Sequence, residues 1–167
     1  MADRALGYDC VGATRPADDG FDAPAGYARY ERSVRIGHGD EDFERAADAV
    51  LAWEVKTRTG FAVMGAEPHE GQRLWITGHV GPLTIAEPAV VVAVLRTADR
   101  AALAYGTLDG HPVSGEEAFL VRRDTDGTVW FTLRSLSRRA RGAWAPAYPG
   151  VLLAQRVFRR RYLRALA

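Results

Sequence analysis

A series of short apolar segments, joined by turns too short for parallel strands, limits the fold more than any other feature of the chain. The segments alternate apolar and polar side chains or form short apolar runs, and they lie at 61–64, 73–77, 83–86, 89–97, 101–108, 116–123 and 128–136. Turn residues separate them, for example at 81–82, 97–100 and 124–127. A parallel crossover needs about a dozen residues or more, so strands that follow one another are predicted to pair antiparallel.

Other periodicities flank this series. Residues 27–36 alternate apolar and polar side chains, which predicts a further strand. Residues 40–55 begin with Asp40 as a predicted N-cap and continue with apolar residues at helical spacing, which predicts an amphipathic helix. Residues 150–166 have one broad apolar face and arginines around the rest, which predicts a long C-terminal helix.

Together these elements predict an α+β fold, with an irregular N-terminal arm at 1–26 and a single domain at 27–167. An antiparallel sheet of this kind has one apolar face to cover, and the C-terminal helix is the element long enough to cover it. We therefore expect a curved antiparallel sheet that grips a long C-terminal helix, with one further helix near the N-terminus. A cavity is expected between the sheet and the C-terminal helix.

Composition excludes several classes of protein. A chain of 167 residues with 47% hydrophobic residues can bury a core without a metal or a disulfide. Cys10 is the only cysteine, so an intrachain disulfide is excluded. No segment approaches the roughly 20 apolar residues of a membrane span, and the first residues do not resemble a secretory signal. We expect a cytoplasmic protein.

Positive charge is concentrated near the C-terminus. The formal net charge is +1, yet residues 134–167 carry nine arginines and no acidic residue. Arginines interleaved with aromatic residues such as Trp144 are typical of single-stranded nucleic-acid surfaces, but also of a helix whose outer face is solvated. Phe158 and Tyr162 lie one turn apart on the apolar side of the predicted helix, which favours the second interpretation. Nucleic acid and membrane surfaces are therefore disfavoured as partners.

The segment richest in chemically active residues is 105–119, where a predicted strand ends in a Gly- and Pro-rich loop that carries His111. Glu116 and Glu117 follow within a few residues, and an imidazole with a carboxylate partner is the usual general acid/base arrangement. Glu117 shares a strand face with Phe119, so it is predicted to point into the interior. In the alternative interpretation His111 caps a tight turn and the glutamates pair with arginines.

Two further motifs do not support a bound group. The sequence Gly37-His38-Gly39 between a strand and a helix lacks the third glycine of a dinucleotide fingerprint, and the acidic residues after it would repel a pyrophosphate. The four histidines show no paired metal-ligand spacing. We expect neither a metal nor a cofactor.

Several long motifs resemble those of one family. They are YDCVGAT at 8–14, GYARYERSVRIGHGDEDFERAADAVLAW at 26–53, YGTLDGHPVSGEEAFLV at 105–121, DGTVWFTLRSLSR at 126–138 and RRRYLRAL at 159–166. Together they resemble the uncharacterised family known as domain of unknown function nineteen-ninety, which occurs in bacteria and plants. The element order of that family is similar to START-like helix-grip proteins, a group that includes lipid carriers, hormone receptors and polyketide aromatase/cyclases.

Three hypotheses about function follow. The first is a binding domain for a small, mostly apolar ligand held between the sheet and the C-terminal helix. The second is a cofactor-free cyclase, dehydratase or isomerase for a polyketide-like substrate, in which His111 and Glu117 are the acid/base pair and Tyr105 or Arg134 stabilises an enolate oxygen. The third is an Arg-rich interaction module at 138–164. The residues expected to contact the ligand are Trp75, Leu103, Tyr105, His111, Glu117, Phe119, Trp130, Arg134 and Phe158.

Overall fold

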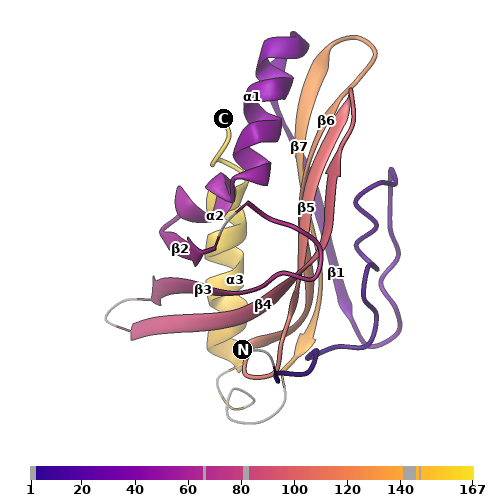
Figure 1. Ribbon diagram of the computed structural model, residues 1–167. Coiled ribbons are helices and arrows are strands. Elements are labelled where there is room, and N and C mark those ends of the chain that lie inside the picture. The colour runs from indigo at the N-terminus through magenta and orange to yellow at the C-terminus, as the bar shows by residue number, and fades with distance from the viewer. Residues whose placement is uncertain (1–2, 66, 81–82, 141–145, 147) are drawn as a thin grey trace.

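A computed structural model describes residues 3–65, 67–80, 83–140, 146 and 148–167 (Figure 1). Its described elements, in chain order, are β1 (Ala28–His38), α1 (Gly39–Leu51), α2 (Glu54–Thr57), β2 (Phe61–Met64), β3 (Arg73–Val80), β4 (Leu83–Arg96), β5 (Arg100–Thr107), β6 (Val113–Arg123), β7 (Thr128–Arg139) and α3 (Tyr148–Tyr162). These strands form one sheet in the order β1-β7-β6-β5-β4-β3-β2, and the paired neighbours are antiparallel. The predicted pairing is confirmed.

The helices cover one face of the curved sheet, and the N-terminal arm lies against the other face (Figure 1). The predicted α+β fold, with a curved antiparallel sheet, a helical N-terminal region and a long C-terminal helix, is confirmed. None of the described helices is both long and apolar enough to cross a membrane. The predicted turn at 81–82, together with Arg141 and Trp144 of the Arg-rich segment, lies outside the described residues.

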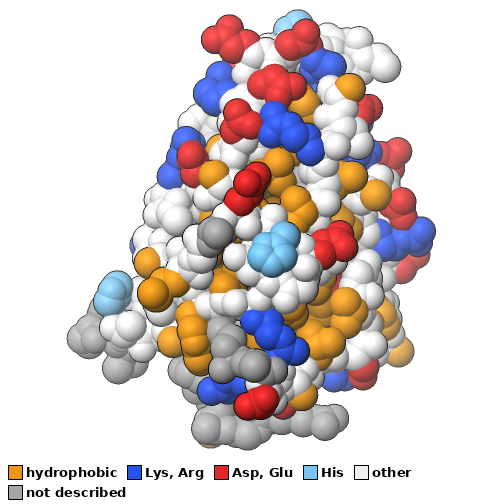
Figure 2. All heavy atoms as spheres, viewed as in Figure 1, with side chains coloured by type: hydrophobic (Ala, Val, Ile, Leu, Met, Phe, Trp, Pro, Cys, Tyr) orange, Lys and Arg blue, Asp and Glu red, His pale blue; other side chains and the backbone are white. Residues whose placement is uncertain are grey.

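The main core lies between the helices and the sheet. Phe43, Ala47 and Val50 of α1 are buried against the sheet because they recur at helical spacing. Phe119 and Phe131 meet them from the sheet, and their ring centroids lie 6.3 Å apart. At the end of the molecule where α1 lies, acidic and basic side chains are mixed over the surface (Figure 2).

The predicted helix at 40–55 is divided in two by Trp53. This residue has φ 61°, a left-handed conformation that bulky side chains rarely adopt. Its buried ring packs against Tyr105 with the centroids 5.5 Å apart, and this contact accompanies the change in chain direction. As a result α2 leaves α1 at an angle and carries Lys56 towards the sheet and α3.

The predicted N-cap of the first helix is wrong. Asp40 lies within the first turn of α1, and the N-cap residue is His38. The carboxylate of Asp42 instead accepts a hydrogen bond from the His38 backbone N–H at 2.8 Å. The Asp42 carboxylate thus accepts a hydrogen bond from a backbone N–H at the start of the helix, where such donors have no partner within the helix.

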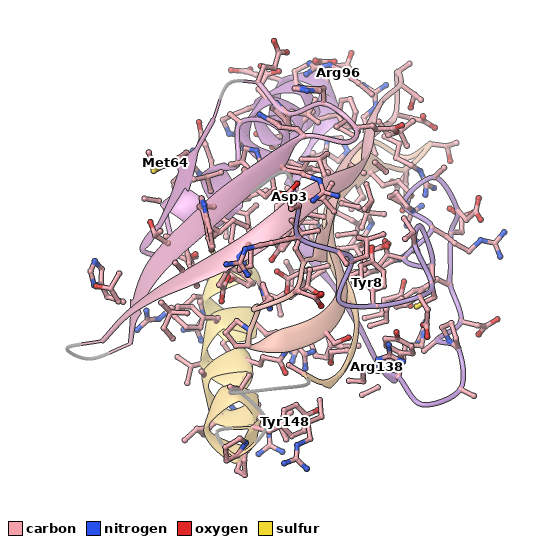
Figure 3. All side chains as sticks on the ribbon, turned by 60° about the horizontal axis from the view of Figure 1, so that its bottom comes forward. Asp3, Tyr8, Met64, Arg96, Arg138 and Tyr148 are labelled. Atoms are coloured by element: carbon pink, nitrogen blue, oxygen red, sulfur yellow. The ribbon has the colours of Figure 1, made fainter. Side chains whose placement is uncertain are left out.

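The N-terminal arm covers part of the second face of the sheet, so residues of β6 and β7 on that face are buried as well. Tyr8 lies where the arm crosses the sheet (Figure 3) and packs with Phe21 and Leu136. The buried carboxylate of Glu116 accepts hydrogen bonds from the Tyr8 hydroxyl at 2.8 Å and from the Thr14 N–H at 3.0 Å. It also accepts hydrogen bonds from the Gly12 N–H at 2.8 Å and from the Thr14 hydroxyl.

Candidate ligand-binding site

A cavity of about 110 Å³ lies between the sheet and α3, at the place where the sequence predicts one. Its helix side is formed by Val151, Ala154 and Phe158 of α3. The ring of Phe61 on β2 lies beside it, 4.7 Å from the ring of Phe158. An apolar cavity of about 150 Å³ can hold a benzene molecule, so this smaller cavity is large enough for one ring at most.

Lys56, the only lysine of the sequence, lines this cavity and is 3% exposed. Its Nζ donates a hydrogen bond to the Tyr162 hydroxyl at 2.8 Å and lies 3.4 Å from the Glu117 carboxylate. Nζ also lies 4.6 Å from the ring centroid of Phe61 and 4.9 Å from those of Tyr105 and Tyr162. A buried ammonium needs such partners, because desolvation of an unpaired charge is costly.

Glu117 and Tyr105 form the next layer of the site. The Glu117 side chain faces the cavity, as its alternation with Phe119 predicts, and its carboxylate accepts a hydrogen bond from the Tyr105 hydroxyl. Burial, reinforced by the nearby negative charge of Glu117, raises the pKa of Tyr105 well above its ordinary value. Burial raises the pKa of Tyr162 in the same way. Both phenols therefore keep their protons near neutral pH.

The structure places the Glu87 carboxylate beside His111, a neighbour that the expected acid/base pair of His111 and Glu117 did not include. The His111 Nε2 atom lies 3.8 Å from the Glu87 carboxylate and has no hydrogen-bond partner among the described residues. Nδ1 accepts a hydrogen bond from the Val113 N–H at 2.9 Å and also lies 2.8 Å from the Val113 carbonyl oxygen. Burial lowers the pKa of His111, so the imidazole is neutral near neutral pH.

The remaining expected ligand contacts fall into two groups. Tyr105, His111, Glu117 and Phe158 line the cavity. Leu103 and Phe119 are fully buried in the core on the same face of the sheet, but they do not line the cavity.

Trp75, Trp130 and Arg134 lie on the opposite face of the sheet, which contradicts their expected place in the cavity. Each is flanked in its strand by residues that face the core, and successive side chains of a strand point to opposite faces. Arg4 stacks on the ring of Trp75 at 5.2 Å, and the indole N–H of Trp130 donates to the Asp124 carboxylate at 3.0 Å.

Arg134 is a partner of the N-terminal arm instead of a ligand anchor. Its Nε donates to the Glu31 carboxylate at 2.8 Å. Its Nη1 donates to the carbonyl oxygens of Thr14, Arg15 and Asp18 at 3.3, 2.8 and 2.9 Å. The buried guanidinium therefore holds the arm on the outer face.

Lys56, Glu87 and the hydroxyl of Tyr162 are site groups that the sequence analysis does not identify. Lys56 could have been singled out in the sequence because it is the only lysine, whereas 21 of the 22 Lys and Arg residues are arginine. The signal for Glu87 is a single carboxylate within the apolar segments at 83–97, on the same face as Ala89 and Val91. Tyr162 is predicted only as a core residue, since periodicity says nothing of its hydroxyl.

A curved antiparallel sheet that holds a C-terminal helix over a cavity defines the helix-grip class of fold. Three solved structures are similar to this chain in fold. They are hypothetical protein jhp0584 from Helicobacter pylori (TM-score 0.54, 14% identity, 84% of both chains covered), Ara h 8.0201 (0.51, 11%, 84% of this chain and 99% of that one) and protein Ms6760 from Mycobacterium smegmatis (0.54, 12%, 83% and 87%).

Within this class the chain belongs to the family described as "Domain of unknown function (DUF1990)", whose model matches residues 7–165. Two relatives support this assignment. A UPF0548 protein of Deinococcus radiodurans is 35% identical over 148 residues, which are 80% of this chain and 73% of the relative. The UPF0548 protein At2g17695 of Arabidopsis thaliana is 31% identical over 134 residues, which are 76% of this chain and 65% of the relative.

Proposed function

We propose that the protein binds a small, mainly apolar molecule between the sheet and α3. The observation that carries this proposal is the cavity of about 110 Å³, whose lining combines aromatic and aliphatic side chains such as Phe61, Val151 and Phe158 with a few ionisable groups. Ligand sites commonly combine an apolar lining with a few convergent polar groups that fix the orientation of the ligand.

The volume of the cavity limits the size of the ligand. Pockets for drug-sized ligands usually enclose about 300–1,000 Å³, so a volume of about 110 Å³ suits a single ring or a short chain. A larger molecule would have to extend past the helix or move it. The ligand class that fits best is a one-ring compound with one polar substituent near Glu117 and Lys56.

Two adjacent residues of α3 provide a matched test. Ala154 lines the cavity, whereas Leu153 is 64% exposed on the other side of the same helix. Toluene titrated into the protein is expected to shift the backbone NMR signals of Ala154 and Phe158 in a saturable way. Ala154→Trp should abolish these shifts by filling the cavity, and Leu153→Trp should leave them unchanged. Absence of saturable shifts in the wild-type protein, or equal binding by both variants, would show that the cavity is not a ligand site.

A cofactor-free cyclase, dehydratase or isomerase is the second candidate. Its supporting observation is the group of ionisable side chains at the sheet end of the cavity, because acid/base catalysis needs such groups in a water-poor site. In this candidate His111 acts with Glu87, and Glu117 acts with Tyr105. Acetophenone, a one-ring ketone, should exchange its methyl protons with D₂O faster in the presence of the protein. His111→Asn should reduce that rate, and an unchanged rate would remove His111 from the mechanism.

A further inference from the structure

We propose that Lys56 forms a reversible imine with a small aldehyde or ketone held in the cavity. Carbonyl compounds are then the ligand class of this site. The inference rests on the proposed binding function, because the carbonyl compound must enter the cavity to meet the amine.

The first argument is the identity and position of Lys56. Arginine fills every other basic position, and the one lysine lies at a buried position that lines the cavity. A guanidinium stays protonated and is a poor nucleophile, whereas a lysine amine that has lost a proton attacks carbonyl carbon. An amine at this position thus provides a reaction that the arginines of the chain cannot provide.

The second argument is the aromatic box around Nζ. The faces of Phe61, Tyr105 and Tyr162 lie within 4.6–4.9 Å of the nitrogen. Ring faces stabilise a cation by their quadrupole, and they do so whether the cation is an ammonium or a protonated imine. The box that holds the ammonium would therefore also hold the protonated imine, with the positive charge at the same atom.

The third argument is a proton acceptor and donor beside the nitrogen. The Glu117 carboxylate lies 3.4 Å from Nζ and is hydrogen-bonded to the Tyr105 hydroxyl, and the Tyr162 hydroxyl lies 2.8 Å from Nζ. Proton transfer during imine formation needs such groups within about one hydrogen-bond length. Glu117 is therefore placed to take a proton from the ammonium and to return it to the carbonyl oxygen.

The reaction balances without a further reactant. The ammonium gives a proton to Glu117, the Nζ lone pair forms a bond to the carbonyl carbon, and the C=O π electrons move to oxygen, which takes the proton back. Glu117 next takes a second proton from the nitrogen and passes it to the hydroxyl, and the carbinolamine loses water as the freed nitrogen lone pair forms the C=N bond. Two hydrogens of the original ammonium leave with the oxygen as water, and a protonated imine remains.

The test uses the full chain, benzaldehyde as the probe and sodium cyanoborohydride to reduce the imine. Intact-protein mass spectrometry should show the mass of one added benzyl group, and peptide mapping should place it on Lys56, the one lysine side chain. Lys56→Arg, with its fold checked by circular dichroism, should lose this adduct and keep only any modification of the N-terminal amine.

A comparison of the native and the urea-unfolded wild-type chain separates a reactive amine from a merely structural one. A buried lysine that serves only the fold is modified more slowly in the native chain than in the unfolded chain, where it is exposed. The proposal requires the opposite order, with at least several-fold faster labelling of Lys56 in the native chain, and equal or slower native labelling overturns it. If Lys56 stays unlabelled while toluene still binds, the imine is wrong and the proposed binding function stands. If toluene also fails to bind, both are wrong.

Discussion

Glu116 and Glu117 are consecutive residues that serve opposite faces of the sheet. Glu117 faces the cavity and lies 3.4 Å from Lys56, whereas the Glu116 carboxylate is surrounded by hydrogen-bond donors of the N-terminal arm. The glutamate pair was identified from the sequence, and the strand period correctly placed Glu117 inside. The contact of Glu117 with Lys56 and those of Glu116 with the arm could not be predicted, because these partners come from segments about 60 to 100 residues away.

Replacement of Glu116 tests how firmly the arm is held. Glu116→Ala leaves the Tyr8 hydroxyl and the amides of Gly12 and Thr14 without their acceptor. Each unsatisfied buried group costs about 1–3 kcal/mol, so the free energy of unfolding should fall by about 3 kcal/mol or more. Urea denaturation measures the change. Glu70→Ala, at an exposed position, is the control and should change stability by less than about 0.5 kcal/mol.

The protonation of His111 predicts a dependence of stability on pH. Burial lowers the pKa of His111 below its usual 6.5 in the folded chain. As the pH falls below 6.5 the unfolded chain gains a proton that the folded chain does not, so the folded state loses stability. His111→Asn keeps an acceptor for the Val113 N–H and should flatten the loss between pH 7 and pH 5 in urea denaturation. His69→Asn, at an exposed histidine, should retain the wild-type slope.

At the scale of elements, order and pairing follow from local pattern. Period-two segments and short turns were enough to predict an antiparallel sheet with a final helix. Boundaries were predicted less well where tertiary contacts decide them, as at Trp53 between α1 and α2. Residues 83–86 and 89–97 were predicted as separate strands but form the single strand β4, with Pro88 inside it and a register shift between Val91 and Ala93.

The pairing of β6 with β7 depends on a glycine. Gly115 has φ 152°, and a Cβ at this position would collide with the carbonyl oxygen of Leu136 on β7. Gly115→Ala should therefore lower the free energy of unfolding by about 2 kcal/mol or more, measured by urea denaturation. Gly150→Ala is the matched substitution, because a Cβ there meets nothing within 4 Å and lies at the start of α3. It should be neutral or stabilising by up to about 1 kcal/mol. Equal effects of the two substitutions would contradict the close β6–β7 contact.

At the scale of the whole molecule, the sheet separates an arm-binding face from a cavity-facing one. Trp75, Trp130 and Arg134 are expected from the sequence to contact the ligand, yet they lie on the outer face. Strand alternation with Leu74 and Phe131 could have separated the two tryptophans from the core-facing set. No local sequence pattern could have shown that carbonyl oxygens of the arm accept hydrogen bonds from Arg134, because the two segments lie far apart in the sequence.

Replacement of Arg134 therefore tests whether the arm-binding face of the sheet can be changed without affecting the cavity. Arg134 holds Glu31 through Nε and the Thr14, Arg15 and Asp18 carbonyls through Nη1, and the single ammonium nitrogen of Arg134→Lys cannot reach both positions. Backbone amides of the arm should exchange hydrogen for deuterium faster, measured by mass spectrometry. Toluene binding should stay within about threefold of wild type, because Arg134 does not line the cavity. A large loss of toluene binding in this variant would show that Arg134 contributes to the ligand site.

The open sheet also has consequences for behaviour at high concentration. Its two outermost strands expose backbone groups that could recruit a neighbouring molecule. On β1, strand-to-strand pairing is opposed by a register shift near Gly37 and by four charged side chains, Arg29, Glu31, Arg32 and Arg35. The other outer strand, β2, has only four residues and ends at Met64, which is 70% exposed (Figure 3). The charges and the register shift of β1, and the short length of β2, should keep folded molecules from pairing through these edge strands.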